Sequence, residues 1–339
     1  MKAAFYEGDK KIRIGECTCI EPEDNEVQIK VSYAGICGTD LHIYLGHMDK
    51  RVKFPQIMGH EMSGVVHALG GEVKHIAVGD RVTVMPLDPC GKCQACLSGH
   101  SHICKNLKFL GIETPGAFQT YWTVPAFAVF PIPDQLPMEH GALIEPLAVA
   151  CHDVRIGDVK KGEYAVVLGG GPIGTLIALV AKEAGARVLV SEINPFRLEL
   201  LKELGMDTIN PKEKDLVEYV NLQTQGTGAD VVFEVTSSAT GAEVMTQLPR
   251  TRGRIVVVAI FSQPPKVDLH RFFWRELKLL GARVYEREDF EKAIQLAAAG
   301  KLPLDRVISE IYPLEDLEKG FKQMESGGQA MKILLSCSR

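Results

Sequence analysis

Four cysteines, Cys90, Cys93, Cys96 and Cys104, lie within fifteen residues of the chain, in the segment DPCGKCQACLSGHSHIC. Four thiolates close a tetrahedral zinc shell and leave no position for water or substrate. Free thiols are the alternative, but a dense cluster in a reducing compartment more often binds metal than forms disulfides. The spacing therefore predicts a structural zinc site that clamps a loop.

A second set of metal-ligating residues is divided between two segments. Cys37 follows an alternating apolar run at 27–31, and His60 and Glu61 stand just before another strand-like run. Taken alone, each of these residues is as readily explained by a structural role as by metal binding. Together they offer sulfur, nitrogen and oxygen donors, and three protein ligands with an open fourth position are typical of a catalytic zinc that polarises an oxygen.

Thr39 and His42 stand three residues apart, and Thr39 lies two residues after Cys37. A hydroxyl beside a zinc site can accept a proton from an alcohol, and an imidazole can deliver that proton to solvent near neutral pH. The alternative is a turn-capping threonine with a surface histidine. We interpret the pair as a proton relay.

The middle of the chain carries a dinucleotide-binding pattern in KKGEYAVVLGGGPIGTLIALVAKEAGARVLVSE. An apolar strand leads into a glycine-rich turn, an apolar helix and a second strand. The first glycine permits the tight turn, the second lets the backbone approach the pyrophosphate, and the third allows close packing of helix on strand. A proline suits the first helical turn. We expect the cofactor to contact Gly169, Gly171, Pro172, Ile173, Gly174, Glu192 and Arg197.

Glu192 stands at the end of the second strand of this pattern. A carboxylate about twenty residues past the glycine turn suits hydrogen bonds to the adenosine ribose hydroxyls and favours NAD over NADP. Arg197, five residues later, can stack on adenine or meet a phosphate. The cofactor we predict is NAD.

The elements that must position these residues follow from apolar periodicity. Apolar runs at 198–210, 229–236, 252–260 and 277–284 continue the alternation of strands and helices. They predict an α/β domain with a parallel sheet of six strands. Amphipathic helices at 287–302 and 314–327 and a strand at 330–336 are expected to return to the first domain.

Composition excludes several classes of protein. With 46% hydrophobic and 24% charged residues, the chain reads as globular, and 339 residues favour two domains. A net charge of −5 argues against a nucleic-acid partner. The sequence has no run of eighteen apolar residues and its N-terminus lacks the apolar core of a signal peptide, so we expect a cytoplasmic protein without a membrane partner.

The motifs GICGTDLH, GHE, the four-cysteine loop, IEPLAVACH and GGGPIG occur in an order that resembles the zinc-containing medium-chain alcohol dehydrogenases. The resemblance spans essentially the whole chain. It implies a catalytic zinc held by Cys37, His60 and Glu61, with Glu145 as a nearby catalytic carboxylate that can become the fourth ligand. It also makes Cys90, Cys93, Cys96 and Cys104 the ligands of the structural zinc, which gives two zinc ions per chain.

The resemblance implies a fold and an assembly as well. The family's fold is a GroES-like, mostly-β catalytic domain, here residues 1–150 and 285–339, built around a Rossmann NAD-binding domain, here 151–284, with the active site in the cleft. It further implies a homo-oligomer, a dimer or a homotetramer.

Two branches of the family share the resemblance. GHE and EPLAV are similar to sorbitol and butanediol dehydrogenases, whereas GTDLHIY, SHICKN and the segment FEKAIQLAAAGKLPLDRVIS resemble L-threonine 3-dehydrogenase. Because EPLAVACH replaces the DPFGNAVH-like segment of threonine dehydrogenases, we predict oxidation of a polyol or vicinal diol. A 3-hydroxy amino acid is the alternative substrate, and a non-catalytic NAD-binding scaffold is the alternative from another class.

Overall fold

The computed structural model describes residues 1–338, which divide into two units. The first comprises Met1–Glu145, Phe290–Gly300 and the residues from Leu304 onward; the second comprises Pro146–Asp289 and Lys301–Pro303. The boundaries differ by five residues from those expected at 150/151 and 284/285, and the short return at 301–303 was not expected. Two helices carry the chain across the boundaries, α4 (Ile144–Ile156) and α10 (Arg287–Ala298).

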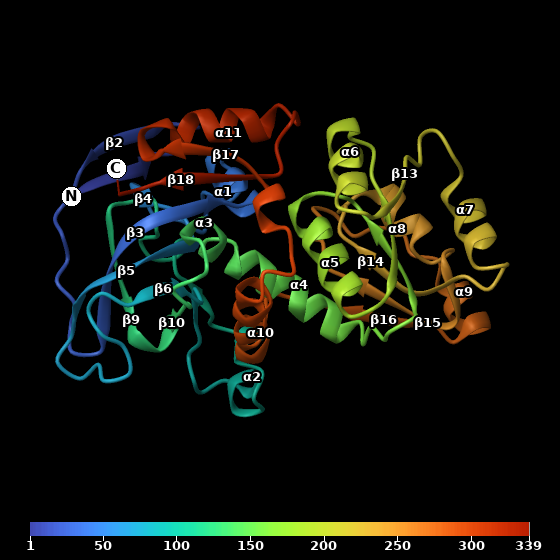
Figure 1. The fold of residues 1–339 in the computed structure, drawn as a ribbon, viewed down its shortest axis with the longest axis horizontal. Coiled ribbons are helices and arrows are strands. Elements are labelled where there is room, and N and C mark those ends of the chain that lie inside the picture. The colour runs from blue at the N-terminus through green and yellow to red at the C-terminus, as the bar shows by residue number, and fades with distance from the viewer. Residues whose placement is uncertain (339) are drawn as a thin grey trace. The chain divides into compact units, whose positions relative to one another are not determined.

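The first unit is built on a seven-stranded sheet with the order β10-β6-β5-β3-β18-β17, in which β9 also pairs with β3. The alternating run at 27–31 forms part of β3, a strand of eleven residues that is buried over most of its length. In Figure 1 this strand lies between β5 and β18, which come from distant parts of the chain. The strands are β3 (Glu26–Ile36), β5 (Glu61–Leu69), β6 (Arg81–Val84), β9 (Tyr121–Pro125), β10 (Val129–Pro131), β17 (Ile308–Pro313) and β18 (Lys332–Ser336).

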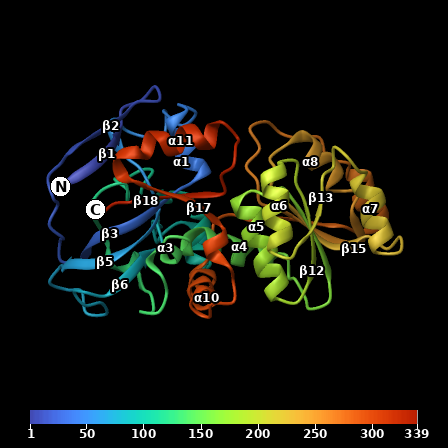
Figure 2. The same ribbon diagram turned by 45° about the horizontal axis from the view of Figure 1, so that its top comes forward.

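Smaller elements complete the first unit. Helix α11 lies beside α1 and β17 in Figures 1 and 2, and the rings of Tyr44 and Phe321 stack between the two helices with their centroids 4.5 Å apart. The expected helix at 314–327 is α11, and the expected strand at 330–336 is β18. The remaining strands are β1 (Lys2–Tyr6), β2 (Ile12–Glu16), β4 (Gln56–Ile57), β7 (Leu87–Asp88) and β8 (Lys108–Phe109); the helices are α1 (Gly38–Tyr44), α2 (Gln94–Leu97), α3 (Met138–Gly141) and α11 (Leu317–Glu325).

The second unit confirms the predicted parallel sheet of six strands, in the order β13-β12-β11-β14-β15-β16. Its central strand, β11, is buried at every residue, as expected where helices cover both faces of a sheet. All six strands are parallel, but successive strands are added on one side of β11 as far as β13 and then on its other side from β14 onward. Open α/β sheets bind ligands beyond the carboxyl ends of the strands at such a switch in strand order. The strands are β11 (Tyr164–Leu168), β12 (Arg187–Ser191), β13 (Asp207–Ile209), β14 (Ala229–Glu234), β15 (Pro249–Val257) and β16 (Lys278–Gly281).

The apolar run at 198–210 was read as a strand-like segment, and most of that reading is wrong. The run begins inside a helix, and only 207–209 form a strand. Asn194 caps the helix by accepting a hydrogen bond from the backbone N–H of Arg197, and a proline at the first helical position favours the same start. The helices of this unit are α5 (Pro172–Glu183), α6 (Pro195–Glu203), α7 (Leu216–Gln223), α8 (Ala239–Val244) and α9 (Leu269–Arg275), together with most of α4.

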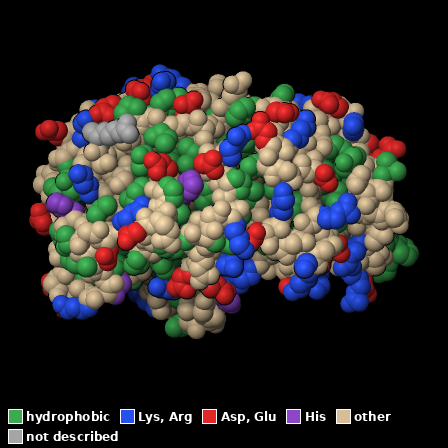
Figure 3. Space-filling model, viewed as in Figure 1, with side chains coloured by type: hydrophobic (Ala, Val, Ile, Leu, Met, Phe, Trp, Pro, Cys, Tyr) green, Lys and Arg blue, Asp and Glu red, His purple; other side chains and the backbone are tan. Residues whose placement is uncertain are grey.

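Acidic and basic side chains are interspersed on the face shown in Figure 3. This distribution accords with the small net charge of −5. Within residues 1–338, no helix has both the length and the apolar character that a membrane crossing requires.

Candidate active site

Cys37 stands where β3 ends and α1 begins, as the N-cap residue of the helix. Its sulfur accepts a hydrogen bond from the backbone N–H of Thr39 at 3.5 Å, while its own N–H donates to Asp40 Oδ2 at 2.9 Å. This reciprocal capping fixes the direction of the thiol. The position of Cys37 after the strand agrees with the sequence, and its role as a helix N-cap was not expected.

His60 precedes β5 and is 3% exposed, with its ring edge-on to that of Phe109. Its Nδ1 lies 3.6 Å from Asp40 Oδ1, and both atoms are buried without a hydrogen-bond partner among the described residues. Burial opposes a charge on the ring, but Asp40 and Cys37 outweigh burial and raise the pKa of His60 well above its usual value. The surroundings of His60 therefore favour a positive charge.

Glu61 completes a group with Cys37 and His60, in which one ligand atom from each residue lies within 4.8 Å of the others. Gly35, the partner of Glu61 in the β3–β5 register, leaves the space for this carboxylate, because a Cβ there would stand 2.1 Å from Glu61 Oε2. The group offers sulfur, nitrogen and oxygen donors, and buried atoms beside it have no hydrogen-bond partner among the described residues. With the acidic side chains around it, this donor set fits a zinc ion.

Two charged residues extend this group. Lys332 of β18, which sequence reasoning missed, donates to both oxygens of Glu61 at 2.7 and 2.6 Å. Glu145, in the first turn of α4, is 4% exposed and does not belong to the group of three potential ligands. It acts electrostatically on Lys332, as do Glu61 and Cys37. Direct ligation by Glu145 stays a prediction.

Helix α1 positions Thr39 and His42 three residues apart, on one side of the helix. Thr39 is half-buried and His42 is exposed. The Nδ1 of His42 lies 3.1 Å from the Nδ1 of His47, a partner that no sequence pattern indicated. The polypeptide folds back here because Gly46 takes a φ of +78° directly after the helix.

The four-cysteine loop brings its sulfur atoms together. The Sγ–Sγ distances are 3.5 Å for Cys93–Cys96, 3.7 Å for Cys93–Cys104 and 3.4 Å for Cys90–Cys104. A tetrahedral zinc with bonds of 2.3 Å would require about 3.8 Å between sulfurs. Hydrogen bonds from the backbone N–H groups of Cys96 and Lys105 lower the pKa of Cys93 to about 6, whereas desolvation and the neighbouring thiols raise the pKa of Cys96 to about 12. The distances between the sulfur atoms fit a closed zinc shell.

The glycine turn joins β11 to α5. Gly169 has a φ of +99°, a conformation that favours glycine, and Gly171 is the N-cap of the helix that starts with Pro172. A Cβ on Gly174 would lie 1.9 Å from the carbonyl oxygen of Gly169, so this position requires glycine. Ile173 is half-buried in the first turn. A glycine turn that leads into a helix N-terminus is the backbone arrangement that suits a pyrophosphate.

Glu192 follows β12 and is 6% exposed. Its Oε2 accepts from the N–H of Gly170 at 2.8 Å, and its Oε1 accepts from the N–H groups of Ile193 and Asn194 at 2.6 and 2.8 Å. The guanidinium of Arg197 lies 3.8 Å from Oε2. Sequence reasoning missed these bonds, through which Glu192 also braces the glycine turn. Because three N–H groups already donate to it, the Glu192 carboxylate has little remaining capacity to accept hydrogen bonds from ribose hydroxyls.

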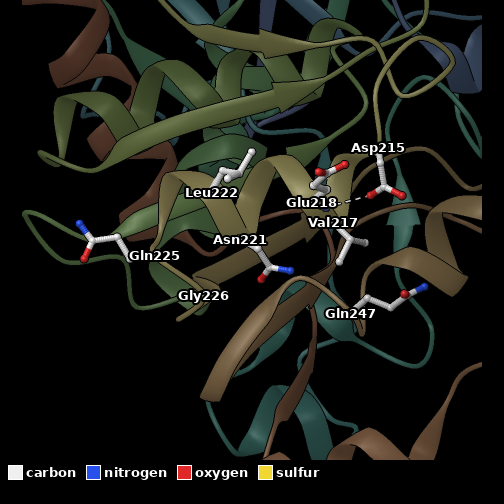
Figure 4. A pocket seen from close by; sticks show the side chains of 8 residues that line it. All are labelled: Asp215, Val217, Glu218, Asn221, Leu222, Gln225, Gly226 and Gln247. Atoms are coloured by element: carbon white, nitrogen blue, oxygen red, sulfur yellow. Dashed lines mark hydrogen bonds between the residues drawn. The ribbon is translucent and has the colours of Figure 1, made fainter.

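A separate cavity of about 640 Å³ lies along α7. Figure 4 shows its lining, in which the Asp215 side chain caps the helix at Glu218 and Gln247 stands on the opposite wall. The lining includes none of the predicted site residues. We assign the chemistry to the zinc and dinucleotide sites instead.

Comparisons with known proteins show which family the chain belongs to. Residues 23–134 match the alcohol dehydrogenase GroES-like domain, and residues 172–299 match the zinc-binding dehydrogenase family. The chain is 52% identical to 2-dehydro-3-deoxy-L-galactonate 5-dehydrogenase from Pseudoalteromonas atlantica, over 100% of this chain and 99% of that protein. It is 38% identical to L-threonine 3-dehydrogenase from Pyrococcus horikoshii, over 91% of this chain and 90% of that protein.

A solved structure gives the same result for the fold. The crystal structure of 2R,3R-butanediol dehydrogenase from Bacillus subtilis superimposes with a TM-score of 0.92 at 33% identity, over 99% of both chains. These matches confirm the resemblance, the GroES-like and Rossmann-type fold and the enzyme class. The chain belongs to the zinc-containing medium-chain alcohol dehydrogenase family and is a zinc-binding dehydrogenase.

Proposed function

We propose that the enzyme oxidises a secondary hydroxyl next to another hydroxyl, on a 2-keto-3-deoxy sugar acid, with NAD as the hydride acceptor. The observation that carries the reaction type is the buried group of Cys37, His60 and Glu61 in a chain that also has a dinucleotide turn. A hydroxyl at carbon 5 of such an acid has hydroxyl-bearing neighbours, so this substrate is a vicinal diol. The relative that is 52% identical over the whole chain supports the choice.

Cys37, His60 and Glu61 would hold the catalytic zinc, with Glu145 as a carboxylate available nearby. When bound, zinc supplies Lewis-acid polarisation of a hydroxyl oxygen. The hydroxyl proton passes to Thr39 and then through His42 to solvent, and NAD, when bound, would accept the hydrogen of the same carbon as hydride. The products are a ketone, NADH and one proton, and the reverse reaction uses the same residues.

The cofactor assignment rests on Glu192. A carboxylate at this position repels a 2′-phosphate, so NAD should be used in preference to NADP. The Glu192 carboxylate accepts hydrogen bonds from three backbone N–H groups, one of them in the glycine turn. Glu192→Ala should therefore weaken the binding of both NAD and NADP, and it should also narrow the preference for NAD over NADP. A wild-type enzyme that used NADP better than NAD would show that Arg197 governs the pocket.

We also propose two zinc ions per chain and a homo-oligomer, a dimer or a tetramer. The closed four-sulfur shell and the open mixed shell each fit one zinc. The sheet of the second unit ends at β16, and the neighbouring α9 exposes Leu269, Phe273 and Trp274. A strand edge that has no partner among residues 1–338, beside exposed apolar side chains, favours association with a second copy.

L-threonine is the second candidate substrate, supported by the relative that is 38% identical. The test is NADH formation by the zinc-loaded enzyme with 2-dehydro-3-deoxy-galactonate, butanediol, hexitols and threonine at equal concentrations. We expect the highest kcat/KM with the sugar acid. A higher value with threonine would favour the second candidate, and a higher value with a simple diol or hexitol would restore the plain polyol interpretation.

A further inference from the structure

Lys332 is a lysine buried beside the candidate zinc ligands. It is the first residue of β18 and is 3% exposed. Its Nζ donates to both carboxylate oxygens of Glu61 at 2.7 and 2.6 Å, and to the carbonyl oxygen of Ile36 at 3.3 Å. Three acceptors therefore satisfy the three N–H donors of a charged ammonium group.

The sheet places this ammonium at the metal site. Strand β18 pairs with β3, with Ile333 opposite Ile36, so Lys332 lies next to the strand end that delivers Cys37. On the other side of β3, Gly35 pairs with Glu61. Three strands that are distant in the sequence thus hold one cation and two candidate ligands together.

Burying an unpaired charge is costly, and a buried pair is retained only when its geometry is good. Lys332 lies within electrostatic range of Glu61, Cys37 and Glu145. When ionised, these three side chains carry three negative charges, whereas one zinc ion carries two positive charges. The ammonium group of Lys332 cancels the one negative charge that remains. A pair that served stability alone would not need to involve a candidate metal ligand.

We propose that Lys332 is a positioning residue that acts on the metal through Glu61: it shares the Glu61 carboxylate with the zinc and neutralises the excess negative charge of the donor set. This inference rests on the proposed function only in taking Cys37, His60 and Glu61 as the zinc ligands. Lys332 holds Glu61 in place before metal binding, and its positive charge then opposes that of the zinc. The result is a site that binds zinc less tightly and leaves it more electrophilic.

The sign of the effect on zinc affinity separates this role from a purely structural ion pair. Lys332→Met keeps a similar length without the charge, so the full-length protein should bind zinc at this site about tenfold more tightly or better, because a like charge close to the metal is removed. The zinc-free variant should also unfold at lower urea concentration than zinc-free wild type, and zinc should restore most of the difference. Lys332→Arg keeps the charge and should bind zinc within about threefold of wild type.

The measurement is a titration with a zinc-binding fluorescent chelator, without substrate or cofactor, on wild type, Lys332→Met, Lys332→Gln and Lys332→Arg. Cys37→Ser identifies the signal of this site. A folded Lys332→Met or Lys332→Gln variant that binds zinc equally or more weakly than wild type would overturn the proposal. If Lys332→Met does not fold, Lys332→Gln decides the sign. If Cys37→Ser binds as much zinc as wild type, the ligand assignment itself is wrong, and the failure then belongs to the proposed function.

Discussion

The glycine turn allows a sharp prediction, because two of its glycines serve different purposes. Replacing Gly174 with alanine places a methyl carbon 1.9 Å from the carbonyl oxygen of Gly169, whereas such carbons essentially never approach other atoms below 3.0 Å. The turn and α5 must therefore separate by at least about 1.1 Å, the difference between these distances. Forcing atoms into a packed site typically costs about 1–3 kcal/mol, and two backbone segments yield less than side chains do. We expect about 3 kcal/mol of destabilisation and weak cofactor binding.

Gly171→Ala is the matched variant. Gly171 has an ordinary φ of −67°, and the nearest atom to an added Cβ is Arg197 Nη1 at 3.6 Å, which is ordinary contact. The unliganded fold should therefore keep its stability within about 0.5 kcal/mol. The added methyl instead occupies the space through which a pyrophosphate approaches the backbone, so NADH affinity should fall about tenfold or more.

Thermal unfolding of the cofactor-free proteins and fluorescence titration with NADH measure the two effects separately. Gly174→Ala should lower both the melting temperature of the second unit and the affinity, and Gly171→Ala should lower the affinity alone. The reasoning would be refuted by a Gly171→Ala variant that binds NADH as wild type does, or by a Gly174→Ala variant that melts at the wild-type temperature.

Three further predictions concern other parts of the chain. Burial and the nearby Asp289 raise the pKa of Asp153 well above its ordinary 3.8. Between 3.8 and the folded pKa, the native state therefore holds a proton that the unfolded state releases. The free energy of unfolding falls as the pH rises through this range. Asp153→Asn should therefore raise the melting temperature at pH 7, with no gain below pH 3.8; an equal gain at both pH values would contradict this sign. Cys104→Ser should reduce the metal content by one zinc and make residues 90–106 sensitive to protease, while NADH titration stays unchanged; protease resistance equal to wild type would argue against a clamp. Thr39→Ala should lower turnover roughly 100-fold with zinc retained, and His42→Ala should lose less and recover with imidazole; full turnover of Thr39→Ala, with chemistry rate-limiting, would exclude the relay.

The features predicted from the sequence are those whose residues are close together in the chain. The four-cysteine loop and the glycine turn each lie within one short segment, so spacing alone carries the signal. Strand β3 also follows directly from its alternation. The run at 198–210 was misread because its apolar residues were taken as strand-like. Its length and the capping by Asn194 indicate a helix better than hydrophobicity alone does.

The partners that the sequence did not predict come from distant strands or from chain reversals. Lys332 and Glu61 are 271 residues apart, and only the β18–β3–β5 register brings them together. His47 reaches His42 because Gly46 reverses the chain. Glu192 was assigned to the ribose by analogy of position, which gives no information on the backbone N–H groups that surround it. Such contacts depend on tertiary register, which local patterns do not encode.

The most direct test of the central claim is the return of activity to metal-stripped enzyme. Zinc is added in steps to wild type and to Cys37→Ser, and NADH formation from 2-dehydro-3-deoxy-galactonate is followed together with bound zinc. We predict that wild-type activity is absent without the second zinc and rises in proportion to its binding, while Cys37→Ser stays inactive at every zinc concentration. Full activity of the metal-stripped wild type, or equal recovery by Cys37→Ser, would contradict a catalytic zinc held by Cys37, His60 and Glu61.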